Sequence, residues 1–109
     1  MDELKFQNPI FSWMNITVRR GVRQLNGTVK LMDPRGYPRF LGYGFVLKYK
    51  IKRFKDIEDK DLELEHDPKC RTYVGLLETM REVYDDFDVN EIVTLIQFEV
   101  PSQKIIMEG

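Results

Sequence analysis

The sequence predicts an α+β domain that is mainly β: a small β-barrel with one principal amphipathic helix. Most of the chain consists of short alternating apolar segments separated by turn residues, and only residues 72–84 carry apolar side chains at helical spacing. With 109 residues, 42% hydrophobic and 32% charged, the chain suits a single domain spanning 1–109. Any functional site is therefore expected in a groove or at the mouth of that one unit.

Residues 15–20 form the strand on which the functional prediction depends. On an extended chain Asn15, Thr17 and Arg19 share one face, and the two β-branched residues between them share the other. One face can anchor in a core while the other holds a ligand. Arginines beside a hydroxyl, an amide and the single tryptophan, Trp13, suit phosphate binding and base stacking. The alternative is a β-branched strand that ends in solvated arginines.

The N-terminal segment comes before this strand. Leu4 and Phe6 alternate with polar residues in 1–7, which predicts a short edge strand. Pro9 breaks that pattern. The apolar residues of 10–14 are expected to lie in the core, with Trp13 as a stacking platform as the alternative.

Two turns and a long strand follow. Asn26-Gly27 predicts a turn, and residues 28–32 a strand. Residues 33–36, Asp-Pro-Arg-Gly, predict the tight turn of a hairpin. Residues 40–54 are the longest strand candidate, in which Gly42 and Gly44 indicate a bend or bulge.

The two faces of the long strand have different compositions. Aromatic and aliphatic residues occupy every second position from 43 to 51, and Lys48, Lys50 and Lys52 lie between them. This alternation predicts that the apolar face packs in the core and that the lysines form the opposite face. The lysine row either contacts a nucleic-acid backbone or discourages edge-to-edge pairing of strands.

The second half of the chain supplies the helix and the last strands. Residues 54–64 are predicted as a short acidic turn or helix, and 65–70 as a loop. Tyr73, Leu76, Leu77, Met80, Val83 and Tyr84 give the apolar stripe of the helix at 72–84. Residues 92–100 are predicted as a strand buried on both sides, and 103–107 as a short last strand or a tail.

Composition limits the other function classes. His66 and Cys70 are the only soft metal ligands, and a zinc site wants three or four, so we expect neither a metal nor another cofactor. No apolar run is long enough to cross a bilayer, and no signal-peptide pattern precedes the domain. We therefore expect no membrane partner and a cytoplasmic location. Cys70 alone cannot form an internal disulfide.

Charge is divided unevenly along the chain. Residues 1–55 carry twelve Lys or Arg and three Asp or Glu, a net charge of +9, whereas residues 56–109 carry five and fifteen, a net charge of −10. A basic half favours a polyanionic partner, unless folding interleaves the two halves.

The order of these features resembles the ASCH family of the PUA-like superfamily over about residues 12–100. The matching features are the Thr17-x-Arg19 strand, Arg53-Phe54 at the end of the long strand, the acidic segment up to Glu65, residues 77–84 of the helix and Phe98-Glu99. The resemblance implies a small β-barrel with a cleft at its mouth. That cleft is proposed to bind RNA or, in some bacterial members, to hydrolyse an N4-acetylated cytidine nucleoside.

The chain departs from the family at the motif Gly-x-Lys-x-x-x-x-Arg. With Arg19 aligned to its arginine, Ser12 stands at the glycine and Met14 at the lysine. In the hydrolase members that lysine, a threonine and a glutamate are the proposed catalytic group. Thr17 and Glu65 match two of the three. A hydrolase would then need Lys52 or another lysine from a different strand.

We therefore expect a non-catalytic domain that binds RNA or a nucleotide through a basic cleft at the barrel mouth. The first alternative is an amidohydrolase using Thr17 and Glu65. The second is a protein-interaction domain that docks a basic partner on the acidic segment 56–67. The residues expected to bind nucleic acid are Trp13, Asn15, Thr17, Arg19, Arg20, Arg23, Lys50 and Lys52.

Overall fold

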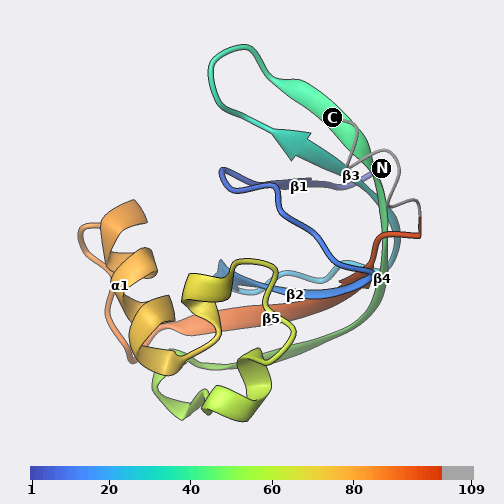
Figure 1. Ribbon diagram of the computed structural model, residues 1–109. Helices are drawn as coiled ribbons and strands as arrows, with labels where there is room; N and C mark the ends of the chain where they lie inside the picture. The colour runs from blue at the N-terminus through green and yellow to red at the C-terminus, as the bar shows by residue number, and fades with distance from the viewer. Residues whose placement is uncertain (102–109) are drawn as a thin grey trace.

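The chain curls a five-stranded mixed sheet into a half-barrel, which confirms the predicted mainly-β α+β class (Figure 1). The computed structural model describes residues 1–101. Within them the sheet order is β1-β3-β4-β5-β2, and only the β1–β3 pair is parallel. The strands are β1 (Glu3–Lys5), β2 (Met14–Arg20), β3 (Gly27–Asp33), β4 (Arg39–Arg53) and β5 (Ile92–Glu99).

Short helices connect β4 to β5 and gather at one end of the sheet (Figure 1). Thr72 caps α1 by accepting a hydrogen bond from the Gly75 backbone N–H at 3.1 Å, and Leu76 and Met80 bury its inner face. Val83, predicted to pack, is the last residue of α1 and is 53% exposed, so this part of the prediction is wrong. The helical segments are η1 (Phe54–Asp56), η2 (Asp59–Leu62), η3 (Pro68–Cys70) and α1 (Tyr73–Val83).

Two hydrophobic clusters pack on opposite faces of β5. Ile96 and Phe98 belong to the cluster inside the half-barrel, with residues of β1, β3 and β4. Val93 and Leu95 belong to the cluster beneath the helical segments. The prediction of a strand buried on both faces is confirmed.

The prediction that the apolar face of β4 packs in the core is wrong along the whole strand, because its aromatic and aliphatic residues at 43, 45, 47, 49 and 51 are 36–49% exposed. Val46 is 4% exposed and faces the barrel interior, whereas Tyr43 and Phe45 are 49% and 44% exposed. The interior leaves no room for larger side chains, since a Cβ atom at Gly44 would lie 3.1 Å from Leu31. Glycines and a valine therefore face inward and the aromatic rings face out.

A β-bulge at Leu47 then changes the alternation of β4. Phe45 lies opposite Glu99 and Lys48 lies opposite Gln97, so Leu47 is the extra residue. Glu99 and Gln97 are two residues apart on β5 and share a face. Phe45 and Lys48 therefore lie on the same face of the sheet, which uninterrupted alternation does not allow.

The predicted hairpin between β3 and β4 is confirmed, although its loop spans residues 34–38 and is longer than the predicted tight turn. No turn is centred on Asn26-Gly27, because residues 22–26 form an irregular loop and Gly27 already begins β3. Gly27 and Gly36 have positive φ values of 71° and 60°. The N-terminal segment is only partly as predicted. In the segment 10–14, Phe11 is buried in the core, but Ile10 and Trp13 are 56% and 54% exposed, so the core prediction is wrong for these two residues. The predicted strand or tail at 103–107 lies outside the described residues.

Candidate functional site

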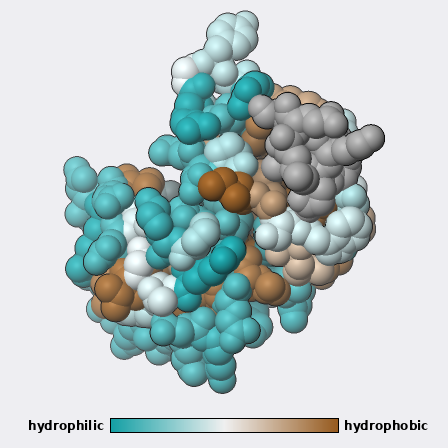
Figure 2. Space-filling view, in the orientation of Figure 1, coloured by the Kyte–Doolittle hydropathy of each residue, from teal (hydrophilic) through white to brown (hydrophobic). Residues whose placement is uncertain are grey.

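The candidate site is a cleft of about 960 Å³ at the mouth of the half-barrel, which we call the mouth cleft. β1 and β2 line one wall, and the segment 65–70 with α1 lines the other. Hydrophilic residues predominate around the opening between α1 and the β3–β4 hairpin (Figure 2). The volume lies within the usual range of small-molecule sites, ~300–1,000 Å³.

Arg19 is the most firmly positioned cation of the mouth cleft. Its Nε donates to the Thr17 hydroxyl at 3.2 Å, and its Nη1 donates to the Lys5 carbonyl at 2.7 Å. The guanidinium lies 4.6 Å from the centre of the Phe6 ring. No carboxylate within residues 1–101 forms an ion pair with it. The positive charge of Arg19 is therefore available to a ligand in the mouth cleft.

Further cations lie around Arg19. The Arg23 backbone N–H donates to the Thr94 hydroxyl at 2.9 Å, which holds the loop after β2 against β5. Lys5 of β1 and Lys69 of η3 complete the group. Burial and the charge of Arg23 lower the pKa of Arg19 to about 10, so Arg19 is still charged at neutral pH. The like charges repel each other, and a bound anion would relieve that repulsion.

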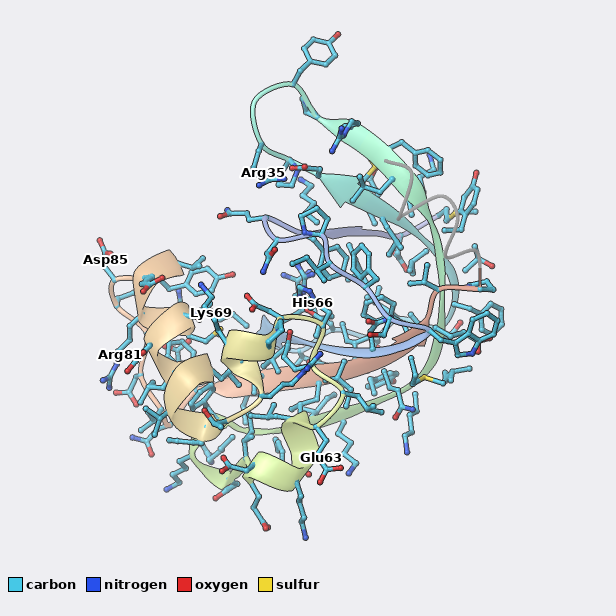
Figure 3. All side chains as sticks on the ribbon, viewed as in Figure 1. Arg35, Glu63, His66, Lys69, Arg81 and Asp85 are labelled. Carbon is cyan, nitrogen blue, oxygen red and sulfur yellow. The ribbon has the colours of Figure 1, made fainter. Side chains whose placement is uncertain are left out.

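Glu65 and His66 form the floor of the opposite wall. The His66 N–H donates to the Ile16 carbonyl at 3.0 Å, which fixes this segment along the edge of β2. Glu65 Oε1 accepts the Asp67 backbone N–H at 3.1 Å and lies 3.3 Å from His66 Nε2. Figure 3 shows His66 deep between the helical segments and β1, with Lys69 nearer the opening.

These two groups are neutral near pH 7. Burial, with a smaller contribution from the Asp67 charge, raises the pKa of Glu65 to about 8, although the hydrogen bond from the Asp67 backbone N–H opposes this shift. Burial and the Arg19 charge lower the pKa of His66 to about 4. Their 3.3 Å contact is therefore a contact between two neutral groups and not an ion pair. His66 Nδ1 is buried without a hydrogen-bond partner in the part of the chain that the structure describes.

The structure brings together Thr17, Arg19, Arg23 and Glu65 from the sequence predictions. Thr17 is 3% exposed, and its hydroxyl is held by Arg19. Thr17 and Arg19 were predicted from the alternation of side chains along β2. The position of Glu65 came only from the family resemblance, because it depends on the path of a loop.

Three predicted residues near β2 lie elsewhere. Trp13 is exposed and does not line the mouth cleft. Asn15 is fully buried, and its side chain exchanges hydrogen bonds with the Ser12 backbone at 2.9 and 2.8 Å. Arg20 points to the opposite face of the sheet, where it pairs with Glu91 at 2.7 Å and Asp86 at 3.1 Å. Asn15 and Arg20 thus stabilise the fold.

The predicted lysines of β4 also lie away from the mouth cleft. Lys52 pairs with Asp61 at 3.1 Å, so it cannot supply the missing hydrolase lysine. Lys50 lines a separate hollow of about 200 Å³ beside Lys48 and Gln97. The two lysines that do line the mouth cleft, Lys5 and Lys69, were not predicted. Lys69 sits in a turn without a recognisable motif, and Lys5 reaches the site only because β1 pairs beside β3.

The acidic segment uses several of its carboxylates within the fold. Asp59 accepts the Tyr73 backbone N–H at 2.8 Å, Asp61 pairs with Lys52, and Asp67 caps η3. Glu63 points away from the mouth cleft (Figure 3). The acidic surface left for a basic partner is therefore smaller than the sequence indicates.

Two general searches complete the description of the site. Across residues 1–101, no three His, Cys, Asp or Glu side chains gather in a way that could hold a metal ion. Over the same residues, no helix has the length and apolar character needed to span a membrane.

The chain has no match among protein-family models, curated proteins or solved structures. Its resemblance to ASCH domains stays a prediction, and the functional argument depends on the geometry of the mouth cleft.

Proposed function

We propose that this protein binds a nucleotide, free or as one unit of an RNA strand, in the mouth cleft and does not catalyse a reaction on it. Arg19 and Arg23 bind the phosphate, assisted by Lys5 and Lys69. Thr17 lies beside the guanidinium of Arg19 and faces the sugar.

The observation that carries this proposal is the pair of like charges at Arg19 and Arg23. Burial and, after it, the charge of the nearby Arg23 lower the pKa of Arg19, and no carboxylate among the described residues forms an ion pair with either guanidinium group. A phosphate supplies the missing charge and accepts hydrogen bonds from both groups.

The size of the site favours one nucleotide unit over a long backbone. Other arginines of the basic half are neutralised: Arg20 pairs with two carboxylates, and Arg35, in the β3–β4 loop, pairs with Asp33 at the end of β3 at 2.7 Å. Two guanidinium groups without an ion pair among the described residues, Arg19 and Arg23, therefore lie in a cleft large enough for a base, a sugar and a phosphate. Cys70, a buried free thiol, is compatible with the cytoplasmic location that we also propose.

Calorimetric titration with uridine monophosphate and with uridine tests the proposal. The monophosphate is expected to bind more tightly, and its affinity is expected to fall as salt rises. Arg19→Ala should weaken it by roughly tenfold or more, the usual loss for a charged hydrogen bond.

Arg20→Ala is the matched control, since Arg20 neighbours Arg19 in sequence but lies on the opposite face of β2. The proposal is wrong if common ribonucleoside monophosphates fail to bind, or if both variants bind them as the unmodified protein does. Thermal unfolding of each variant separates lost binding from lost folding.

An amidohydrolase is the second candidate, favoured by one observation. Thr17, Glu65 and two lysines, Lys5 and Lys69, line the same cleft. A Glu65 carboxyl with a pKa of about 8 can exchange a proton near neutral pH. Against it, the Thr17 hydroxyl accepts from Arg19, and no base within residues 1–101 forms a hydrogen bond with it.

Acetate release from N4-acetylcytidine decides between the two candidates. Hydrolysis adds water across the amide bond and gives acetate and cytidine. If the hydrolase assignment is right, acetate appears and Thr17→Ala abolishes it, while Thr28→Ala, on an exposed position of β3, leaves it unchanged. Nucleotide binding without acetate supports the non-catalytic assignment.

A further inference from the structure

The outer face of β4 carries aromatic rings and lysines on the same side of the sheet. Tyr43 and Phe45 face outward in its first half, and the bulge at Leu47 turns Lys48 and Lys50 to that same side. Lys30 of β3 lies opposite Tyr43 and joins them. We call these five residues the outer-face track: Lys30, Tyr43, Phe45, Lys48 and Lys50.

Cross-strand neighbours establish that the track is continuous. Phe45, Lys48 and Lys50 lie opposite Glu99, Gln97 and Leu95, three alternate residues of β5. Alternate residues of a strand share a face. Val46, between them in sequence, lies opposite Phe98 and is buried inside the half-barrel. Rings and amines therefore follow one another along a single surface.

The rings of the track are unusually exposed for their size. Tyr43 and Phe45 expose 49% and 44% of their surface, and Phe40 packs edge-on against Tyr43 with ring centres 5.1 Å apart. None of the helical segments covers the outer side of the β3–β4 hairpin (Figure 1). Neighbouring exposed rings mark a binding surface more often than a solvated one.

The charge of the track favours an anionic partner. Lys30, Lys48 and Lys50 form no ion pair within the described part of the chain. Four carboxylates are close. Glu99 lies beside Phe45, and Glu3 lies beside Lys30 but lines the mouth cleft. Asp61, which pairs with Lys52, and Glu63 line the hollow that Lys48 and Lys50 also line. Lysines along a row of rings are the arrangement that binds single-stranded nucleic acid, where amines contact phosphates and rings stack on bases.

We propose that the outer-face track binds single-stranded RNA by stacking bases on Tyr43 and Phe45 and placing phosphates against Lys30, Lys48 and Lys50. The two rings are ~6.6 Å apart along the strand, twice the rise per residue, which suits successive bases of an extended chain. The track is a second site, separate from the mouth cleft, and does not depend on the function proposed there.

Fluorescence anisotropy with a short labelled oligouridine tests this site. We expect binding by the unmodified protein in the presence of excess uridine monophosphate, which occupies the mouth cleft if that proposal is right. Tyr43→Leu with Phe45→Leu keeps apolar surface but removes both stacking faces, and it should weaken binding by roughly tenfold per ring. Tyr37→Leu is the control, an aromatic residue that is 94% exposed in the β3–β4 turn.

The lysines are tested through the salt dependence of the same binding. Replacing Lys48 and Lys50 with alanine should lower the slope of log affinity against log salt by roughly 0.7 for each phosphate that the protein no longer neutralises. Lys55→Ala, an exposed lysine of η1, should leave the slope unchanged.

Three results overturn the proposal. Oligouridine does not bind; the double leucine variant binds it as tightly as the unmodified protein; or sedimentation shows that the track is occupied by a second copy of the chain, with dissociation in the double leucine variant. Because both rings are outside the core, thermal unfolding within a few degrees of the unmodified protein confirms that the variant folds. Loss of mononucleotide binding in Arg19→Ala tests the mouth cleft alone.

Discussion

The Arg19 guanidinium of β2 donates a hydrogen bond to the Lys5 carbonyl of β1 at 2.7 Å, which joins the two edges of the sheet across the open side of the half-barrel. The same group binds Thr17 and lies over Phe6. One side chain therefore holds a wall of the mouth cleft in place and supplies its best-positioned charge.

Removing that link should reduce stability as well as binding. Arg19→Ala is expected to lower the free energy of unfolding by about 1.5–3 kcal/mol, the usual range for hydrogen bonds to a charged group. Urea denaturation measures it. Arg20→Ala should cost clearly less, because water screens ion pairs at the surface. Equal losses for the two variants would contradict the role of the Lys5 contact.

The buried carboxyl group of Glu65 should make stability fall as pH rises. Its pKa is about 8 in the folded protein and 4.5 in the unfolded chain, so the folded state holds the extra proton between these values. His66, with a pKa lowered from 6.5 to about 4, gives an opposite slope only below pH 6.5. Between about pH 6.5 and 8, of these two groups only Glu65 changes the stability, so the free energy of unfolding is expected to decrease as the pH rises.

Glu65→Gln should remove this decrease, because the amide does not titrate and still accepts the Asp67 N–H. Urea melts at several pH values between 6.5 and 8 measure the slope for each protein. Glu63→Gln, on an exposed neighbouring residue, is the control and should keep the slope of the unmodified protein. A flat profile for the unmodified protein would mean that Glu65 is ionised in the fold.

Gly75 should be irreplaceable even by alanine. A Cβ atom there would overlap the backbone carbonyl of Lys69, which leaves no space between α1 and η3. Gly75→Ala is expected to cost about 1–3 kcal/mol, as for overpacked sites, and to displace the wall that carries Lys69. Val74→Ala, on a residue that is 64% exposed, is the control. Thermal unfolding and nucleotide affinity should both change in the glycine variant only.

The orientation of β4 predicts opposite results for two adjacent residues. Val46→Ala should cost about 2 kcal/mol, since Val46 is buried and two methyl groups are lost. Phe45→Ala removes a larger side chain from an exposed position and is expected to cost under about 1 kcal/mol. Denaturant titration of both proteins checks the order. The reverse order would restore the arrangement expected from alternation alone.

The helices and strands were largely predictable from sequence, whereas the elements that each of them pairs with or packs against were not. The turn at Gly36, the helix capped by Thr72 and the doubly buried β5 follow from local patterns. The outward aromatic face of β4 does not, because only the packing around Gly44 shows that the interior has no space. The alternation of side chains shows that a strand has two different faces, but it does not show which face packs in the core.

The candidate site shows the same limit. Thr17 and Arg19 follow from the alternation of one strand, but nothing local indicates that Arg20 meets Glu91, a residue 71 positions away. Lys5 and Lys69 enter the cleft through sheet order and the path of a turn. Contacts between residues distant in the chain decide these placements, and composition does not report them.

The extra residue at Leu47 makes β4 sensitive to length rather than to composition. Deleting Leu47 itself would leave Val46 opposite Phe98 and Lys48 opposite Gln97 in regular alternation, so both halves of the strand would keep their faces. A single-codon deletion elsewhere in β4 would instead turn the side chains on one side of the gap to the other face of the sheet. In a comparison of orthologues, the position of a gap here would therefore tell more about conserved surface chemistry than the identity of any neighbouring amino acid.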